Sequence, residues 1–388
     1  MNDFTYYIPT KIHFGKNALD YLGQDAKKYG KKVLLTYGGG SIKKNGIYDR
    51  VIEELTKADM EIFELSGIKP NPRIESVREG ADICKKENID LIIAIGGGST
   101  IDATKFMAAG AKVDFDPWLF ISEGREIKDA LPIFSILTIA ATGSEMDTGG
   151  VITNEETNEK LSTGSEYMRP KVSYLNPEYT YSVSKFQTAS GSSDILSHLF
   201  EIYFNDNTSM HMLDQMMEAL MKTVIKYAPR ALENPEDYEA RANLMWASSW
   251  AINGFLSETS QKSWSCHPME HELSAFYDIT HGLGLAILTP RWMEYILDEE
   301  TVDKFVDYGV NVFGIDKNLD KFDIAKKAIE KTSEFFFDTL GLDDSLTKIG
   351  IDESKFDIMA KKACNNSSIK GFKELKPEDV KEIYKMCL

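Results

Sequence analysis

The chain has 388 residues, of which 43% are hydrophobic, and it carries a formal net charge of −17. This length exceeds one ordinary hydrophobic core and favours two domains, and the apolar content is that of a globular protein, not a disordered one. The negative charge counts against nucleic acid as a partner, because binding to a phosphate backbone needs a basic surface.

Short apolar runs alternate with amphipathic stretches over roughly the first 180 residues. Buried strands are predicted at residues 31–37, 60–65, 91–99 and 132–142, and helices at 47–58, 74–87 and 101–111. The pieces 151–164 and 171–177 are expected to be short and extended, as in a hairpin. Strands that alternate with helices predict a parallel, doubly wound sheet with helices on both faces.

After residue 184 the strand signals stop, and long amphipathic segments such as SDILSHLFEIYF and HMLDQMMEALMKTVIKYAPRAL take over. This change of periodicity predicts an α/β domain over residues 1–183 and an all-helical domain over residues 184–388.

Two glycine runs, GGGS at 38–41 and GGGS at 96–99, each follow a predicted strand and precede a predicted helix. Ligands of open α/β sheets bind outside the carboxyl ends of the strands. Glycines there let the backbone approach a pyrophosphate, whose charge is stabilised by amides and a helix N-terminus. Neither run matches G-x-G-x-x-G, and a single glycine run is more often only a tight turn. Two runs at equivalent strand ends favour a phosphate site.

Half of the six histidines lie in one segment, HPMEHELSAFYDITHG at 267–282. His267 and His271 are four residues apart, as are Asp194 and His198, so each pair lies on one helical face. One such pair is more often a surface pair. Two pairs in a histidine-poor region favour a site for a divalent transition metal such as Fe²⁺ or Zn²⁺. The other two histidines, His13 and His211, are interpreted as structural.

The chain resembles the iron-containing (group III) alcohol dehydrogenases, near their bacterial butanol dehydrogenase and aldehyde reductase branch, over essentially its whole length. The resemblance rests on PNP (70–72), GGGSTIDATK (96–105), TIAATGSE (138–145), ASGSSDILSHLFEIY (189–203) and HPMEHELSAFYDITHGLGLAI (267–287). It implies the two-domain fold shared with dehydroquinate synthase. A Rossmann-like dinucleotide-binding domain is then followed by an all-α domain for metal and substrate.

The resemblance also implies functional residues. The family's metal ligands match Asp194, His198, His267 and His281, whereas His271 matches a histidine beside the nicotinamide that is not a ligand. The cofactor-binding positions match Gly38, Gly39, Asn71, Gly97, Gly98, Ser99, Asp102, Thr138, Thr142 and Lys160. Asp102 has a simpler interpretation as a first-turn acid that complements the helix dipole. One departure is Asn176, where many members have Asp; it lies away from the matched ligands.

The reaction implied is hydride transfer between a nicotinamide and an aldehyde or alcohol, with the metal polarising the substrate oxygen. His271 is the candidate to relay the alcohol proton, because its unperturbed pKa lies near the working pH. Trp264, Phe276 and Tyr277 lie in the presumed site segments of the second half, 189–203 and 262–287, whose Lys and Arg residues are limited to Lys262. We therefore expect short to medium uncharged aliphatic substrates.

Two other functions fit parts of these patterns. A dehydroquinate synthase-like lyase would share the fold, the metal and the dinucleotide, but its phosphorylated substrate would call for several Lys and Arg residues. A metal-free nucleotide-binding protein would share only the glycine runs, and the intact Asp and His pattern counts against it.

The turn after the first predicted strand predicts NADP(H) over NAD(H). An NAD-selective site usually places an acid where it binds the ribose hydroxyls and repels a 2′-phosphate. LLTYGGGSIKK has no acid from Tyr37 to Lys44, whereas Ser41 offers a hydroxyl and Lys43 and Lys44 offer positive charge. The simpler interpretation is a solvent-facing turn with two lysines.

The sequence further predicts a cytoplasmic protein without a membrane span, and we expect a homodimer. No apolar run approaches the roughly 18–20 residues that cross a bilayer, and MNDFTYYIPTK has no export signature. The four cysteines, Cys84, Cys266, Cys364 and Cys387, are scattered without a C-x-x-C pair, as reduced thiols would be.

Overall fold

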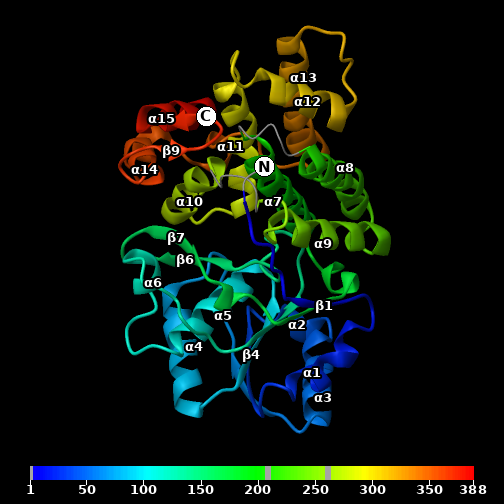
Figure 1. Cartoon of the computed structure of the whole chain (residues 1–388), viewed down its shortest axis with the longest axis vertical. Helices are drawn as coiled ribbons and strands as arrows, with labels where there is room; N and C mark the ends of the chain where they lie inside the picture. The colour runs from blue at the N-terminus through cyan, green and yellow to red at the C-terminus, as the bar shows by residue number, and fades with distance from the viewer. Residues whose placement is uncertain (1–2, 206–210, 258–263) are drawn as a thin grey trace. The chain divides into compact units, whose positions relative to one another are not determined.

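The computed structural model describes residues 3–205, 211–257 and 264–388, and the chain forms two compact units (Figure 1). The α/β unit comprises Tyr7–Val183 and Pro235–Asn253. The helical unit comprises Met1–Tyr6, Ser184–Asn234 and Gly254–Leu388.

A six-stranded parallel sheet is the centre of the α/β unit, with the order β1-β8-β5-β4-β2-β3. The strands are β1 (Lys11–Phe14), β2 (Lys32–Tyr37), β3 (Glu61–Leu65), β4 (Leu91–Gly96), β5 (Ile133–Leu137) and β8 (Val172–Leu175). Every residue of β4 is buried, which explains why its sequence is an unbroken apolar run without the alternation of a half-exposed strand.

Helices cover both faces of this sheet (Figure 1). Val33 and Leu35 of β2 pack with α1 (Leu22–Ala26) and α3 (Ile47–Lys57). Leu34, which points the other way, packs with α4 (Ile74–Glu87) and α5 (Gly98–Gly110). The predicted doubly wound sheet is therefore confirmed.

Individual elements differ from the sequence prediction in two places. Residues 151–164 do form part of a hairpin, β6 (Gly149–Asn154) paired with β7 (Glu159–Gly164). The piece 171–177 is not in that hairpin, because it becomes β8 between β1 and β5 of the main sheet. Strand β1 was not predicted, since KIHF is short and only partly buried at the sheet edge.

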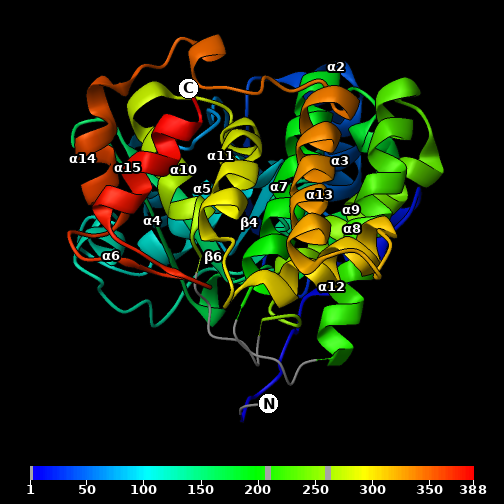
Figure 2. The same cartoon turned by 90° about the horizontal axis from the view of Figure 1, so that it is seen from above.

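The helical unit is built around α7 (Lys185–Tyr203), which is buried along nearly its whole length and packs against α8 (His211–Glu233) and α11 (His281–Ile296). The other helices, some of which Figure 2 shows from above, are α10 (Cys266–Tyr277), α12 (Val302–Phe313), α13 (Lys321–Glu334), α14 (Phe356–Ala363) and α15 (Pro377–Met386). Two strands of two residues each, β9 (Ile369–Lys370) and β10 (Glu374–Leu375), form an antiparallel pair that interrupts the helical pattern. In the parts of the chain that are described, no helix is long and apolar enough to cross a bilayer.

Helix α9 (Tyr238–Ile252) belongs to the α/β unit, although the sequence analysis placed residues 184–388 in one helical domain. Met245 joins a small cluster with Ala94 and Leu137 of the sheet, and the Ser248 hydroxyl donates to the Ala141 carbonyl over 3.0 Å. Amphipathic spacing shows that a helix has an apolar face, but not which core covers that face.

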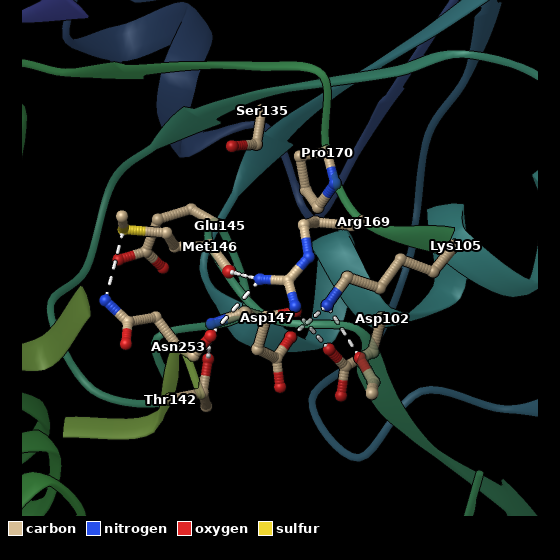
Figure 3. Close-up of polar contacts among 12 residues, drawn as sticks. Asp102, Lys105, Ser135, Thr142, Glu145, Met146, Asp147, Arg169, Pro170 and Asn253 are labelled. Atoms are coloured by element: carbon tan, nitrogen blue, oxygen red, sulfur yellow. Dashed lines mark hydrogen bonds and ion pairs between the residues drawn. The ribbon is translucent and has the colours of Figure 1, made fainter. Parts of the chain in front are cut away.

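Buried charges hold the loop 142–150 to the α/β unit (Figure 3). Lys105, fully buried on α5, pairs with Asp147 and donates to the Gly149 carbonyl over 2.6 Å. Asp102 accepts hydrogen bonds from the Ser144 hydroxyl (2.5 Å) and the Val151 N–H (3.0 Å). The loop is therefore fixed by the first turns of α5.

A second set of contacts holds the same loop from the other side. Arg169 donates to the carbonyls of Met146 (2.6 Å) and Asn253 (3.2 Å), as Figure 3 shows. The Ser249 hydroxyl of α9 donates to the Glu145 carboxyl. Burial raises the pKa of Glu145 to about 7, although the hydrogen bond from Ser249 lowers it.

The stability of the protein is expected to depend on pH through Glu145. Because its folded pKa is raised from 4.5 to about 7, the folded state keeps a proton that the unfolded chain releases, so stability falls as pH rises between these values. In Glu145→Gln, the fall in the free energy of unfolding over this pH range should be smaller by up to roughly 3 kcal/mol. The variant should therefore show a flatter dependence of Tm on pH between 4.5 and 8.

The readout is the slope of Tm against pH and not the value of Tm itself, because the buried Gln amide lowers stability by an amount that does not change with pH. Glu156→Gln, at an exposed position of the β6–β7 turn, is the matched control and should keep the wild-type slope. Equal slopes in Glu145→Gln and wild type would contradict the assignment.

Candidate functional site

Three helices of the helical unit bring the predicted metal ligands together. Asp194 and His198 lie one turn apart on the buried face of α7. His267 is the second residue of α10, and His281 is the first residue of α11. The first three side chains are buried, whereas the His281 side chain is 23% exposed.

The Nε2 atoms of three imidazoles surround Asp194 Oδ1, at 3.5 Å for His198, 3.7 Å for His281 and 4.0 Å for His267. These distances exceed those of ordinary hydrogen bonds. They are close to the separation of about 3.3–3.6 Å expected between ligand atoms that each lie about 2.0–2.2 Å from a tetrahedral metal ion. The ligand atoms of Asp194, His267 and His281 also lie within 4.8 Å of one another. Asp194, His267 and His281 therefore fit one divalent cation, and His198 lies outside this group with its Nε2 3.5 Å from Asp194 Oδ1.

The electrostatics of His198 suit the same role. Burial lowers its pKa well below 6.5, and a charge on the neighbouring His267 lowers it further. The two rings stack with centroids 4.9 Å apart. A histidine held neutral at ordinary pH is in the form that binds a metal.

His271 lies beside this cluster and outside the group formed by Asp194, His267 and His281. Its ring centroid is 5.7 Å from that of His281 and 6.4 Å from that of His267. It belongs to a second group with Glu270 and His281, whose ligand atoms lie within 4.8 Å of one another. The structure thus places His271 next to the proposed ligands, half-buried at the edge of their cluster.

The three aromatic residues expected near the site separate in the structure. The Trp264 ring lies against His267 and His198, with centroid distances of 4.3 Å and 5.5 Å. Phe276 and Tyr277 instead lie under the ammonium group of Lys355, at 5.1 Å and 5.0 Å. Of these three aromatic residues, Trp264 is the one that lies against the histidine cluster, and Lys262 lies outside the described residues.

Sequence reasoning missed two buried glutamates that contact the histidines. Glu201 of α7 contacts His267 Nδ1 at 3.2 Å, and Glu270 of α10 contacts His281 Nδ1. Burial raises the pKa of Glu201 to about 7, against the lowering effect of backbone N–H groups at Ser265 and His267. A signal was present: each glutamate lies three residues after a histidine of its own helix, on the same face.

In the α/β unit, the strand order creates a switch point between β2 and β4. From β2 the chain passes to β3 on one side, and from there it returns to β4 on the other side. Open α/β sheets bind ligands at such a point, outside the carboxyl ends of the strands. The predicted cofactor residues found at this edge are Gly38, Gly39 and Ser41 after β2, Asn71 after β3, Gly97, Gly98 and Ser99 after β4, and Thr138 and Thr142 after β5.

The glycines at this edge differ in what surrounds them. A Cβ at Gly39 would meet nothing within 4 Å, so this position faces open space. A Cβ at Gly97 would collide with Ile139, and one at Gly98 would collide with Thr142. Gly97 and Gly98 are therefore required by the close packing of the segment after β5, whereas Gly39 leaves room for a ligand.

Two predicted cofactor residues are buried within the unit. Asp102 accepts hydrogen bonds from Ser144 and Val151, and burial raises its pKa to about 6. Lys160 lies buried on β7 of the hairpin. The contacts of Asp102 give it a structural role beneath the loop 142–150.

An acid that the sequence analysis did not consider lies at the end of β2. Glu64 of β3 accepts hydrogen bonds from the hydroxyls of Tyr37 (2.5 Å) and Tyr48 (2.6 Å). Lys43 Nζ lies 3.8 Å from Glu64 Oε2 and 4.4 Å from the centre of the Tyr48 ring. The segment from Tyr37 to Lys44 contains no acidic residue, but the pairing of β3 with β2 places Glu64 next to it.

Comparison with known proteins identifies the family. Residues 9–177 match the model of the iron-containing alcohol dehydrogenases, and residues 188–388 match the C-terminal model of the same family. The chain belongs to the iron-containing alcohol dehydrogenase family.

Relatives of this family cover the chain from end to end. NADH-dependent butanol dehydrogenase A of Clostridium acetobutylicum is 54% identical over 99% of both chains. The NADPH-dependent aldehyde reductase YqhD of Escherichia coli is 36% identical over 93% of both. The crystal structure of NADH-dependent butanol dehydrogenase A from Thermotoga maritima superposes with a TM-score of 0.95 at 38% identity, covering 100% of this chain and 99% of that one. This alcohol dehydrogenase is thus an NAD(P)-dependent enzyme with the predicted α/β and helical architecture.

The ligand assignment predicts that His267→Ala loses most of its bound metal together with most of its turnover, because one of four ligands to a buried ion is removed. Metal content by atomic emission spectroscopy and kcat on the same preparation are the measurements. His211→Ala, at an exposed position at the start of α8, is the control and should keep both.

His271→Ala is expected to keep its metal and lose rate, because this ring lies beside the four proposed ligands and outside the group of Asp194, His267 and His281. Metal loss as complete as that of His267→Ala would place His271 among the ligands. Full metal content in His267→Ala would show the ligand set to be wrong.

Proposed function

We propose that this alcohol dehydrogenase reduces short- to medium-chain aliphatic aldehydes to alcohols, and catalyses the reverse reaction, with one divalent ion held by Asp194, His198, His267 and His281. The observation that carries the proposal is the convergence of three imidazole Nε2 atoms on one buried carboxylate oxygen. The ligand types suit Fe²⁺ and Zn²⁺ alike.

When bound, the ion polarises the oxygen of the substrate and the nicotinamide supplies or accepts the hydride. The protein's own groups then hold the substrate and move one proton. His271, beside the ligands and half-buried, can reach solvent as well as the site. An imidazole both donates and accepts near neutral pH, so His271 is proposed to transfer the alcohol proton.

The surroundings of the cluster support an uncharged substrate. Trp264 lies against two of the proposed ligands, and an apolar ring there favours an alkyl chain. The butanol dehydrogenase names of two of the relatives described above agree with this class. A dehydroquinate synthase-like lyase is not supported, because both matching family models are those of alcohol dehydrogenases.

Turnover is expected with a series of straight-chain aldehydes from propanal to hexanal, with gradual differences in kcat/KM. A single methylene in an apolar pocket contributes only about 1–3 kcal/mol, so neighbouring chain lengths should differ modestly. The matched comparison is with aldehydes of similar length that carry a carboxylate or a phosphate. Reaction with the charged compounds alone would overturn the proposed substrate class.

For the coenzyme, we propose NADP(H) over NAD(H). The open space at Gly39 leaves room for a 2′-phosphate, and Lys44 is exposed at the same turn. A charge-assisted hydrogen bond contributes roughly 1.5–3 kcal/mol, which corresponds to at least tenfold. Two observations oppose this preference. The carboxylate of Glu64 lies 3.8 Å from Lys43 Nζ and neutralises part of its charge. The name of the Clostridium acetobutylicum relative calls it NADH-dependent, whereas that of YqhD calls it NADPH-dependent.

The ratio of kcat/KM for NADPH and NADH with one aldehyde tests this choice. Wild type is expected to favour NADPH by about tenfold, and Gly39→Asp should shift the ratio toward NADH because its carboxylate repels a 2′-phosphate. Gly39→Asn is the uncharged control of similar size. Glu64→Gln should raise the preference for NADPH, since it frees Lys43. A wild type that favours NADH would refute the proposal.

We further propose a cytoplasmic location and a homodimer. All four cysteines are buried and free, as expected of a protein from a reducing compartment. Size-exclusion chromatography with light scattering measures the oligomeric state directly.

A further inference from the structure

We propose that Glu201 and Glu270 are positioning residues, which hold the rings of His267 and His281 so that Nε2 of each faces Asp194, where the metal is proposed to bind. The inference rests on the proposed ligand set and extends it to two residues that touch the ligands without being ligands themselves. It assigns the affinity of the site for metal in part to these two carboxylates.

Glu201 is surrounded by hydrogen-bond donors. Its side chain is 2% exposed, and its Oε2 accepts the Ser265 N–H over 2.6 Å. Oε1 accepts the His267 N–H over 3.0 Å and lies 3.2 Å from His267 Nδ1. Both oxygens of this carboxyl already accept backbone N–H groups, so its contact with Nδ1 fits a ring nitrogen that carries the proton and donates it. Nε2, the nitrogen that faces Asp194, is then left with its lone pair.

Glu270 makes the equivalent contact one helix further along the chain. It is fully buried on α10, and its Oε2 contacts His281 Nδ1 while its Oε1 accepts the Ser274 hydroxyl. The backbone leaves room for this carboxyl at Gly284, where a Cβ would lie 2.8 Å from Glu270 Cγ. With Nδ1 of His281 engaged by Glu270, its Nε2 faces Asp194 at 3.7 Å.

The two contacts form one repeated pattern across three helices. On α7, Glu201 follows His198 by three residues, and it holds the histidine of α10. On α10, Glu270 follows His267 by three residues, and it holds the histidine of α11. α7 and α10 therefore each carry a proposed histidine ligand and, three residues later, a glutamate that contacts the histidine ligand of another helix. A hydrogen bond from the far ring nitrogen to a carboxylate fixes tautomer and ring angle and raises ligand basicity.

The test is metal affinity, measured on protein stripped with a chelator and titrated with Zn²⁺ against a chromophoric competitor. Glu201→Gln and Glu270→Gln should each bind Zn²⁺ about 10–100-fold more weakly than wild type, the range typical of such residues. Glu218→Gln is the matched control. It removes a buried carboxylate of α8 that contacts Tyr203 and Asn311, not a histidine, and should leave the affinity unchanged.

A second measurement does not depend on how the variants fold. In metal-free wild type, ¹⁵N NMR of the imidazoles should show His267 and His281 protonated at Nδ1.

Glu201→Asp, which keeps the charge on a shorter side chain, should recover part of the affinity lost in Glu201→Gln.

The outcomes separate this inference from the proposed ligand set. Loss of metal in His267→Ala, together with wild-type affinity in both glutamine variants, would refute positioning and keep the ligands. Retention of metal in His267→Ala would refute the ligands. Protonation at Nε2 of His267 and His281 in the wild type would overturn the inference even if the glutamine variants fail to fold.

Discussion

One buried carboxylate organises the helical unit. Asp194 lies on α7 with three imidazole nitrogens around a single oxygen, at distances too long for hydrogen bonds and suited to ligands of one ion. A carboxylate in a protein interior is costly unless its charge is compensated. Because the rings around this carboxylate come from α7, α10 and α11, the packing of these helices and the chemistry of the site depend on each other.

The two buried glutamates that contact the histidines have hydrogen-bond partners of their own. Glu201 and Glu270 are buried among N–H and O–H donors, and each contacts the far nitrogen of a histidine. Polar groups in a core are kept when every one finds a partner of the right kind. A ring held in this way cannot turn its other nitrogen away from Asp194 without breaking a buried hydrogen bond.

In the α/β unit, buried polar side chains hold the loop 142–150, which follows β5 at the edge of the sheet where the cofactor is proposed to bind. Lys105 and Asp102 of α5 bind the loop 142–150 at some of its residues, and Arg169 and Ser249 bind it at others. Loops that carry function are placed by a rigid scaffold. Here part of the scaffold is a set of buried ionisable side chains, and burial raises the pKa of Asp102 to about 6 and that of Glu145 to about 7.

The sequence by itself determined what depends on local pattern. Strand and helix periodicity predicted the parallel sheet and the helix-rich second half, and α4 occupies the predicted residues 74–87. The spacing of Asp194 and His198 placed both on one helical face, because that relation is fixed by the helix repeat. The glycine runs marked the strand ends at which the sheet has its switch point.

Tertiary structure alone decided what depends on which elements meet. Glu64 reaches the turn after β2 only because β3 pairs with β2, so an inspection of residues 37–44 could not find it. Helix α9 packs with the sheet, since amphipathic spacing does not specify a partner. Glu201 and Glu270 contact histidines 66 and 11 residues further along the chain. Such contacts are set by packing between helices, which local sequence periodicity does not encode.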